Sequence, residues 1–96
     1  MTALIDSHMA RRKANGWLVS YVGSVIAQQP QLIQENGRLR WRFTAFLATM
    51  GHPHRGPVGF VDVDAYSGEV LTKENDAEEL IANATHIAIS LPTAIS

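Results

Sequence analysis

The spacing of apolar residues changes along the chain and divides it into a helical start, a β-rich middle and a helical end. From Met9 to Ile26 the apolar residues recur with a period close to 3.6, which predicts an amphipathic helix that ends before Pro30. A second helical stripe occupies the last third of the chain. There, Asn75 and Glu78 have the spacing of a capping box, so the second helix is expected over residues 75–88.

Between the two helical stripes the apolar period is two, as in half-buried β-strands. Asn36-Gly37 is the dipeptide favoured by two-residue hairpin turns, so residues 31–35 are expected to pair with a long strand that begins at Arg38. Further strands are expected at residues 58–66 and 69–73. The sequence therefore predicts an α+β fold with an N-terminal helix, a four-stranded antiparallel meander and a C-terminal helix, both helices covering the same sheet face.

Length and composition indicate a single domain over residues 1–96, with residues 89–96 as a tail. The chain has 96 residues, of which 46% are hydrophobic and 18% are charged. Its formal net charge of -1 gives no electrostatic basis for nucleic-acid binding. Cysteine is absent, which excludes disulfides and thiolate metal sites. Because no apolar run is long enough to span a bilayer and no leader-like segment is visible, we expect no membrane contact and a cytoplasmic location.

Alternation in the central strands predicts a charged sheet face that points away from the helices. Arg40 and Arg42 alternate with apolar residues in one strand, and Asp62 and Asp64 do so in the next. The expected register places Arg42 opposite Asp64 and Thr44 opposite Asp62. The ordinary explanation of such a face is a solvated surface with weak cross-strand ion pairs. The functional alternative is an electrostatic patch that selects a partner.

At one end of this face the outward-facing residues become apolar, and large apolar patches rarely stay bare on a soluble monomer. A homodimer through this patch is the preferred prediction, because one self-complementary patch is enough for twofold symmetry. The alternative cover is the tail at residues 87–95. The predicted interaction surface, for a protein partner or a second copy, comprises Phe46, Met50, Val58, Phe60, Arg40, Arg42, Asp62 and Asp64.

Candidate catalytic and metal-binding residues are few. His52 and His54 could lie near one another, but no third His and no carboxylate forms a cluster with them nearby in the sequence. Asp62 and Asp64 share a strand face, where neighbouring arginines would keep both ionised and so unsuited to acid–base catalysis. We therefore predict no catalytic residues, no metal and no cofactor. A small metal-dependent hydrolase that uses His52 and His54 is the rival interpretation.

The segment FVDVDAYSGEVL at residues 60–71 resembles the closing hairpin of PepSY domains, and WRF at residues 41–43 is similar to the strand that precedes it. In this hairpin Asp64 can bind the turn amides, Ser67 lies in the turn and Gly68 takes the positive-φ position. PepSY domains are generally regarded as non-catalytic, and some resemble inhibitory propeptides of peptidases. The resemblance implies a non-catalytic protein-interaction or regulatory module, inhibitor-like in role. An antitoxin or immunity-type partner of a neighbouring gene product is the alternative.

Overall fold

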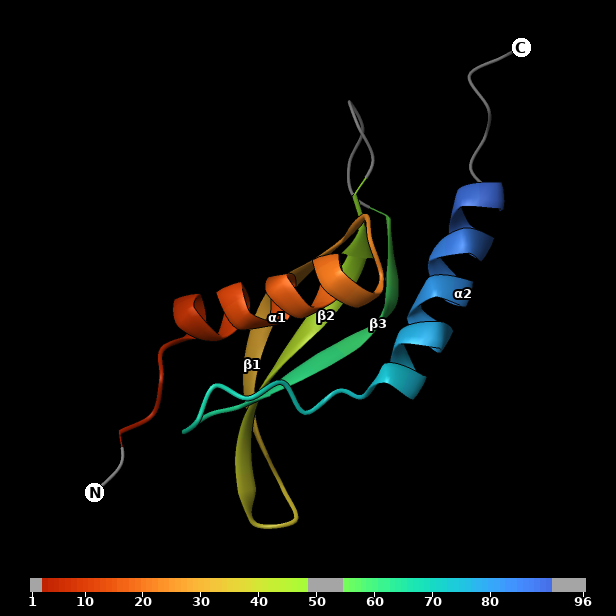
Figure 1. Cartoon of the computed structure of the whole chain (residues 1–96). Helices are drawn as coiled ribbons and strands as arrows, with labels where there is room; N and C mark the ends of the chain where they lie inside the picture. Colours follow the sequence, from red (N-terminus) through yellow and green to blue (C-terminus); the bar gives the residue numbers. More distant parts are fainter. Residues whose placement is uncertain (1–2, 49–54, 91–96) are drawn as a thin grey trace.

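Two helices and one antiparallel sheet make up a computed structural model of the chain, which describes residues 3–48 and 55–90. The elements in order are α1 (Ser7–Tyr21), β1 (Val25–Glu35), β2 (Arg38–Leu47), β3 (Arg55–Asp64) and α2 (Glu74–Ser90). The strands pair in the order β1-β2-β3. Helix α1 crosses one face of the sheet and α2 runs beside β3 (Figure 1). The α+β class with an antiparallel sheet is confirmed.

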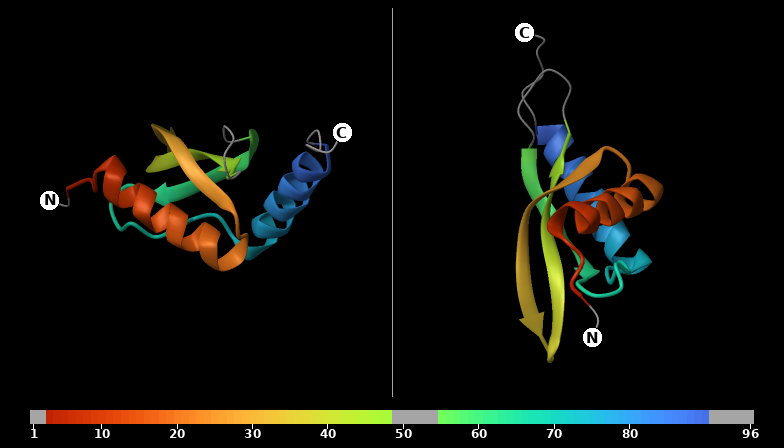
Figure 2. Two further views of the ribbon diagram at one scale, coloured as in Figure 1. Left: turned by 90° about the horizontal axis from the view of Figure 1, so that it is seen from above. Right: turned by 90° about the vertical axis from the view of Figure 1, so that its left-hand side faces the viewer.

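The core lies between α1, α2 and the inner face of the sheet (Figure 2). Helix α1 turns Ala10, Ala14 and Leu18 toward the sheet, and all three are fully buried. Small residues at the first two positions let the helix backbone approach the strands closely. The strands contribute buried side chains at Val25, Ala27, Phe43, Ala45, Leu47, Val58, Val61 and Val63, and α2 contributes Ala77 and Leu80. The opposite face of the sheet, here called the outer face, carries the predicted charged residues.

The prediction of four strands is wrong, because the described part of the chain forms a three-stranded sheet. Residues 69–73 run beside β3 but make only one isolated bridge, between Val63 and Val70. The amide of Asp62 donates to the side-chain hydroxyl of Thr72 at 2.9 Å instead of to a main-chain carbonyl. A regular ladder needs main-chain acceptors at successive positions. The segment therefore leaves the edge of β3 after one bridge and leads into α2.

The first helix is shorter than predicted. It ends at Tyr21, whereas the sequence predicted that it would continue up to Pro30. The amides of Val22 and Gly23 both donate to the Leu18 carbonyl, and Gly23 adopts a φ of +115°. A glycine in this conformation ends the helix. The β-branched residue Val25 then begins a strand. Because Val25 and its neighbours also fit the helical period, the apolar pattern alone does not separate the two structures.

The strand β1 continues through Pro30 by means of an irregularity in its pairing. Gln29 has a φ of +55°, and the register shifts between Gln28 and Gln31. Pro30 is tolerated in such a bulge, where the chain needs no ladder amide. Beyond it the hairpin register is the predicted one, with Glu35 opposite Arg38.

The register between β2 and β3 differs from the prediction by two residues. Arg42 lies opposite Asp62, and Arg40 lies opposite Asp64. A second irregularity, between Ala45 and Leu47, accompanies this difference. A shift of two residues keeps every side chain on its predicted face, because successive side chains alternate between faces.

Helix α2 begins earlier and ends later than predicted. Lys73 is the residue before its first turn, and its amide donates to the Asp76 carboxylate at 3.0 Å. This is the reciprocal half of a capping box, two residues before the predicted pair Asn75 and Glu78. The helix runs to Ser90, so the first two residues of the predicted tail are helical. Residues 91–96, the rest of that tail, lie outside the described residues.

Candidate functional site

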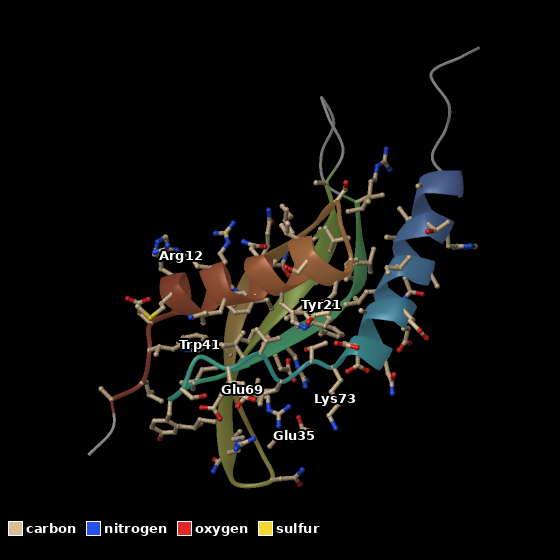
Figure 3. All side chains as sticks on the ribbon, viewed as in Figure 1. Arg12, Tyr21, Glu35, Trp41, Glu69 and Lys73 are labelled. Atoms are coloured by element: carbon tan, nitrogen blue, oxygen red, sulfur yellow. The ribbon has the colours of Figure 1, made fainter. Side chains whose placement is uncertain are left out.

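Six charged side chains form an ion cluster on the outer face of the sheet. They project from β1, β2 and β3, because every second residue of a strand faces the same side. We call this group the outer-face cluster; its members are Glu35, Arg38, Arg40, Arg42, Asp62 and Asp64. The sequence predicted most of this group as an interaction surface. Glu35 lies at the end of β1 in the projecting hairpin (Figure 3).

Asp62 is the centre of this cluster. Arg42 contacts it through two parallel hydrogen bonds, from Nε to Oδ1 and from Nη2 to Oδ2, both 2.9 Å long. Arg40 donates from Nη1 to Oδ2 at 3.0 Å. Bidentate arginine–carboxylate pairs of this kind fix the geometry of both side chains. Arg42 also reaches Glu35 at 3.3 Å, so the cluster joins all three strands.

Asp62 remains ionised in this setting. Its burial acts to raise the pKa, but the hydrogen bonds from Arg42 and Arg40 outweigh burial and hold the pKa of Asp62 below the ordinary value of 3.8. The same bond to Asp62 raises the pKa of Arg42. Such a carboxylate carries no proton near neutral pH and has its oxygens occupied. It serves to hold two arginines in place.

Asp64 organises the turn that follows β3. Its Oδ1 accepts hydrogen bonds from the amides of Tyr66 at 2.8 Å and Ser67 at 2.9 Å. Gly68 follows with a φ of +78°, which is a conformation that favours glycine. The Ser67 amide contributes most to a lowered pKa of Asp64, and Arg38 at 3.2 Å adds to it. The residues assigned to the turn from the sequence are thus brought together in one Asx-type turn.

Phe60 is the large apolar side chain beside the cluster. Just over half of it is exposed (56%). The guanidinium carbon of Arg42 lies 5.7 Å from the centre of its ring, a cation–π distance. Because Arg42 is fixed by Asp62, the ring of Phe60 lies against an ordered charged neighbour. The outer face therefore presents an exposed aromatic ring on a rigid polar support.

The other predicted apolar residues of this surface have different surroundings. Val58 is buried (2% exposed), and its carbonyl accepts a hydrogen bond from the Asn83 amide of α2 at 2.8 Å. Phe46 is half-buried. Met50, like His52 and His54, lies outside the described residues. Helix α2 of the same chain thus covers part of the patch for which the sequence predicted a second copy.

A groove of about 300 Å³ separates β3 from α2 next to the cluster. Arg40 lines it, and the Arg40 Nε is buried without a hydrogen-bond partner among the described residues. On the side of α2 the groove is lined by Asp76, Glu79 and Asn83. These three recur at helical spacing, which could have indicated a shared face. Sequence reasoning missed them because their proximity to Arg40 depends on how α2 packs.

Other kinds of site find no support within residues 3–48 and 55–90. No three His, Asp or Glu side chains of this part of the chain are arranged to hold a metal ion. None of the described helices has the length and hydropathy needed to cross a membrane.

Comparison with known proteins leaves the family open. Neither a protein-family model, nor a curated protein, nor a solved structure matches this chain. The resemblance of residues 60–71 to PepSY domains therefore stays a prediction from the sequence.

Proposed function

We propose that this protein is a non-catalytic interaction module that binds another protein through the outer face of its sheet, with Phe60 at the centre of contact. The observation that carries the proposal is the exposed Phe60 ring held beside Arg42. Aromatic and arginine side chains dominate the binding energy of protein interfaces, and charged residues that form a rim exclude water around them.

The rigidity of this surface favours binding. Ordering a long side chain at an interface costs conformational entropy. Arg42 and Arg40 are already fixed by Asp62, so a partner would meet a surface that needs little further ordering. Three basic and three acidic residues make up the outer-face cluster, so its formal charge is balanced. A suitable partner would offer an apolar pocket for Phe60 with polar groups of both signs around it.

A non-catalytic role is consistent with the state of the carboxylates. Asp62 and Asp64 both have lowered pKa values and accept hydrogen bonds from arginine side chains or turn amides. A general acid needs a pKa near the working pH, which these groups lack. The inhibitor-like role implied by the PepSY resemblance is a regulatory form of the same proposal, in which the bound partner would be an enzyme.

Site-specific photo-crosslinking tests the proposal in cells of the source organism. A photoreactive phenylalanine analogue replaces Phe60, and a second variant carries it at Val19, an exposed position on α1 (72% exposed). We expect one discrete adduct with another protein from position 60, and loss of that adduct when Arg42 is changed to Glu. Asp62→Asn serves as a milder variant that keeps the shape of the side chain.

The results separate the possibilities. An adduct at position 60 that Arg42→Glu removes supports the proposal. Equal labelling of many proteins from positions 60 and 19 would contradict it. An adduct of twice the chain mass from position 60 would show that the partner is a second copy of the chain, which is the homodimer that the sequence predicts.

A further inference from the structure

Helix α1 exposes two apolar side chains on the side that faces away from the sheet. Ala10, Ala14 and Leu18 define its buried side. On the opposite side Met9 and Val19 are 49% and 72% exposed. They share that side with Arg12 and Gly16, because positions 9, 12, 16 and 19 follow the helical repeat. The picture of the whole chain shows no element in front of this face of α1 (Figure 1).

Gly16 has no role within the described part of the chain that requires glycine. It lies inside α1, where glycine is the weakest helix former after proline. A Cβ built at this position would meet no atom within 4 Å. Because Gly16 has no side chain, the surface of α1 is flat between Arg12 and Val19. Such a place allows a second helix to approach closely.

The two helices carry opposite charges. Helix α1 contains Arg11, Arg12 and Lys13 and no acidic residue, whereas α2 contains four acidic residues and no Lys or Arg. Arg11 is engaged with the Ala27 carbonyl at 3.1 Å. In α2, Asp76 and Glu79 line the groove beside β3. The other two acidic residues, Glu74 and Glu78, have the spacing of one helical turn and share a flank of α2 with Ile81, which is 42% exposed.

The basic residues of α1 and the acidic residues of α2 lie near opposite ends of α1. The basic residues occupy its N-terminal half, and α2 begins beside its C-terminal end (Figure 2). Tyr21, in the last turn of α1, lies on the side of α1 nearest α2, whereas Arg12 lies at the far end (Figure 3). From the basic residues of α1 the surface therefore passes through Gly16 and the apolar Val19 to the acidic start of α2. A surface with this order is complementary to itself when it is turned through 180°.

We propose that two copies of this chain associate through α1, packed antiparallel across a twofold axis that passes near Gly16. In this arrangement Val19 of each copy lies within one helical turn of the axis, and Met9 of each copy extends toward the start of the other copy's α2. The basic end of each α1 meets the acidic start of the other copy's α2, around Glu78. An isologous contact of this kind closes as a dimer and leaves the outer face of both sheets free. The proposal is independent of the partner proposed for Phe60.

The first test separates folding from association at Gly16. Gly16→Gln adds a good helix former at an open position, so thermal unfolding of the monomer at high dilution is expected to shift upward by a few degrees. The same change places a side chain at the crossing point and is expected to weaken dimerisation by roughly tenfold or more, measured by sedimentation equilibrium. Ala88→Gln, at an exposed position on α2 almost three turns beyond Glu78, is the matched control and leaves the dimer unchanged.

The second test uses reversed charges in separate chains. Arg12→Glu and Glu78→Lys each place like charges at both symmetry-related contacts, so each variant alone is expected to be a weaker dimer at low salt. When the two variants are mixed, every such contact again pairs opposite charges, and a heterodimer should form with near wild-type affinity. Misfolding of one variant would not restore association in the mixture.

Three results would overturn the proposal. The first is a wild-type chain that stays monomeric at the highest concentration reached. The second is a dimer that neither Gly16→Gln nor the charge reversals weaken. The third is a dimer that is lost with Phe60→Asp and kept with Gly16→Gln, which would assign self-association to the outer face of the sheet.

Discussion

The side chain of Leu80 occupies the space that a Cβ would take at Gly59. Leu80 projects from α2 and is almost fully buried, and Gly59 lies in β3 opposite Ala45. A Cβ built on Gly59 would overlap with the Leu80 Cδ2 atom. Close contact between α2 and the sheet thus depends on a strand residue without a side chain, which is a recurring use of glycine in strands.

Gly59→Ala is therefore expected to lower the free energy of unfolding by about 1–3 kcal/mol, the usual cost of an overpacked core. Urea unfolding measures this loss. Leu80→Ala alone should lose about 2–5 kcal/mol through the cavity it creates. The double variant should lose less stability than the sum of the two single losses, because the smaller side chain at position 80 leaves room for the Cβ at position 59. Strict additivity would show that the two residues do not compete for space. Gly16→Ala is the control and should not lose stability.

The extent to which this fold could be predicted depends on whether a feature is fixed locally. The hairpin turn at Asn36 and Gly37 was predicted with its register, because this dipeptide selects a tight turn from a few residues alone. The boundary between α1 and β1 was missed, because Val22, Val25 and Ile26 continue the helical spacing of the apolar residues. Gly23, one of the three residues between the two elements, ends the helix through a conformation that the pattern does not reveal.

The candidate site shows the same division. Alternation predicted that Arg42 and Asp62 share the outer face, since a strand's side chains have a period of two. Their direct pairing depends on the register between β2 and β3, which differs by two residues from the predicted one and is accompanied by an irregularity near Ala45. The contact between Arg40 and the groove lined by Glu79 depends on the packing of α2. No local signal in the sequence specifies that packing.

The outer-face cluster makes stability depend on pH in the acid range. The pKa of Asp62 and that of Asp64 lie below the ordinary value of 3.8 in the folded chain. A carboxylate with a depressed folded pKa adds stability above the pKa it has when unfolded, and this stability is lost as the pH falls through the folded pKa. The free energy of unfolding should therefore be constant from neutral pH to about pH 5 and then fall.

Asp62→Asn isolates the part of this effect that belongs to Asp62. At neutral pH the variant should be less stable than the wild type, because Arg40 and Arg42 lose their shared anion. Below pH 4 the difference should shrink, since Asp62 of the unfolded chain takes up a proton there and the folded carboxylate does so only at still lower pH. Thermal unfolding between pH 7 and pH 2 tests this. A difference that stays constant throughout would mean that the charge of Asp62 contributes nothing to stability.

Asn15 covers the exposed edge of β1. Its Oδ1 accepts a hydrogen bond of 2.8 Å from the Ala27 amide, and Arg11 donates to the carbonyl of the same residue. Asn15→Ala leaves this amide without its acceptor, at an expected cost of about 1–3 kcal/mol. Asn15→Asp retains an acceptor at the same place and should lose less. Hydrogen exchange provides a local measurement: the Ala27 amide should exchange faster in Asn15→Ala. Unchanged exchange would indicate that the bond does not protect this edge.

Thr72 has the corresponding role at the edge of β3, and its hydroxyl replaces the main-chain acceptor that a fourth strand would supply. Thr72→Val keeps the shape of the side chain and removes the acceptor of the Asp62 amide. Because this amide is partly buried, we expect a loss of about 1–3 kcal/mol in the free energy of unfolding. Thr85→Val makes the same change at an exposed position on α2 and should be nearly neutral. If residues 69–73 instead formed a complete strand in solution, a main-chain carbonyl would accept from Asp62, and the two valine variants would have the same stability.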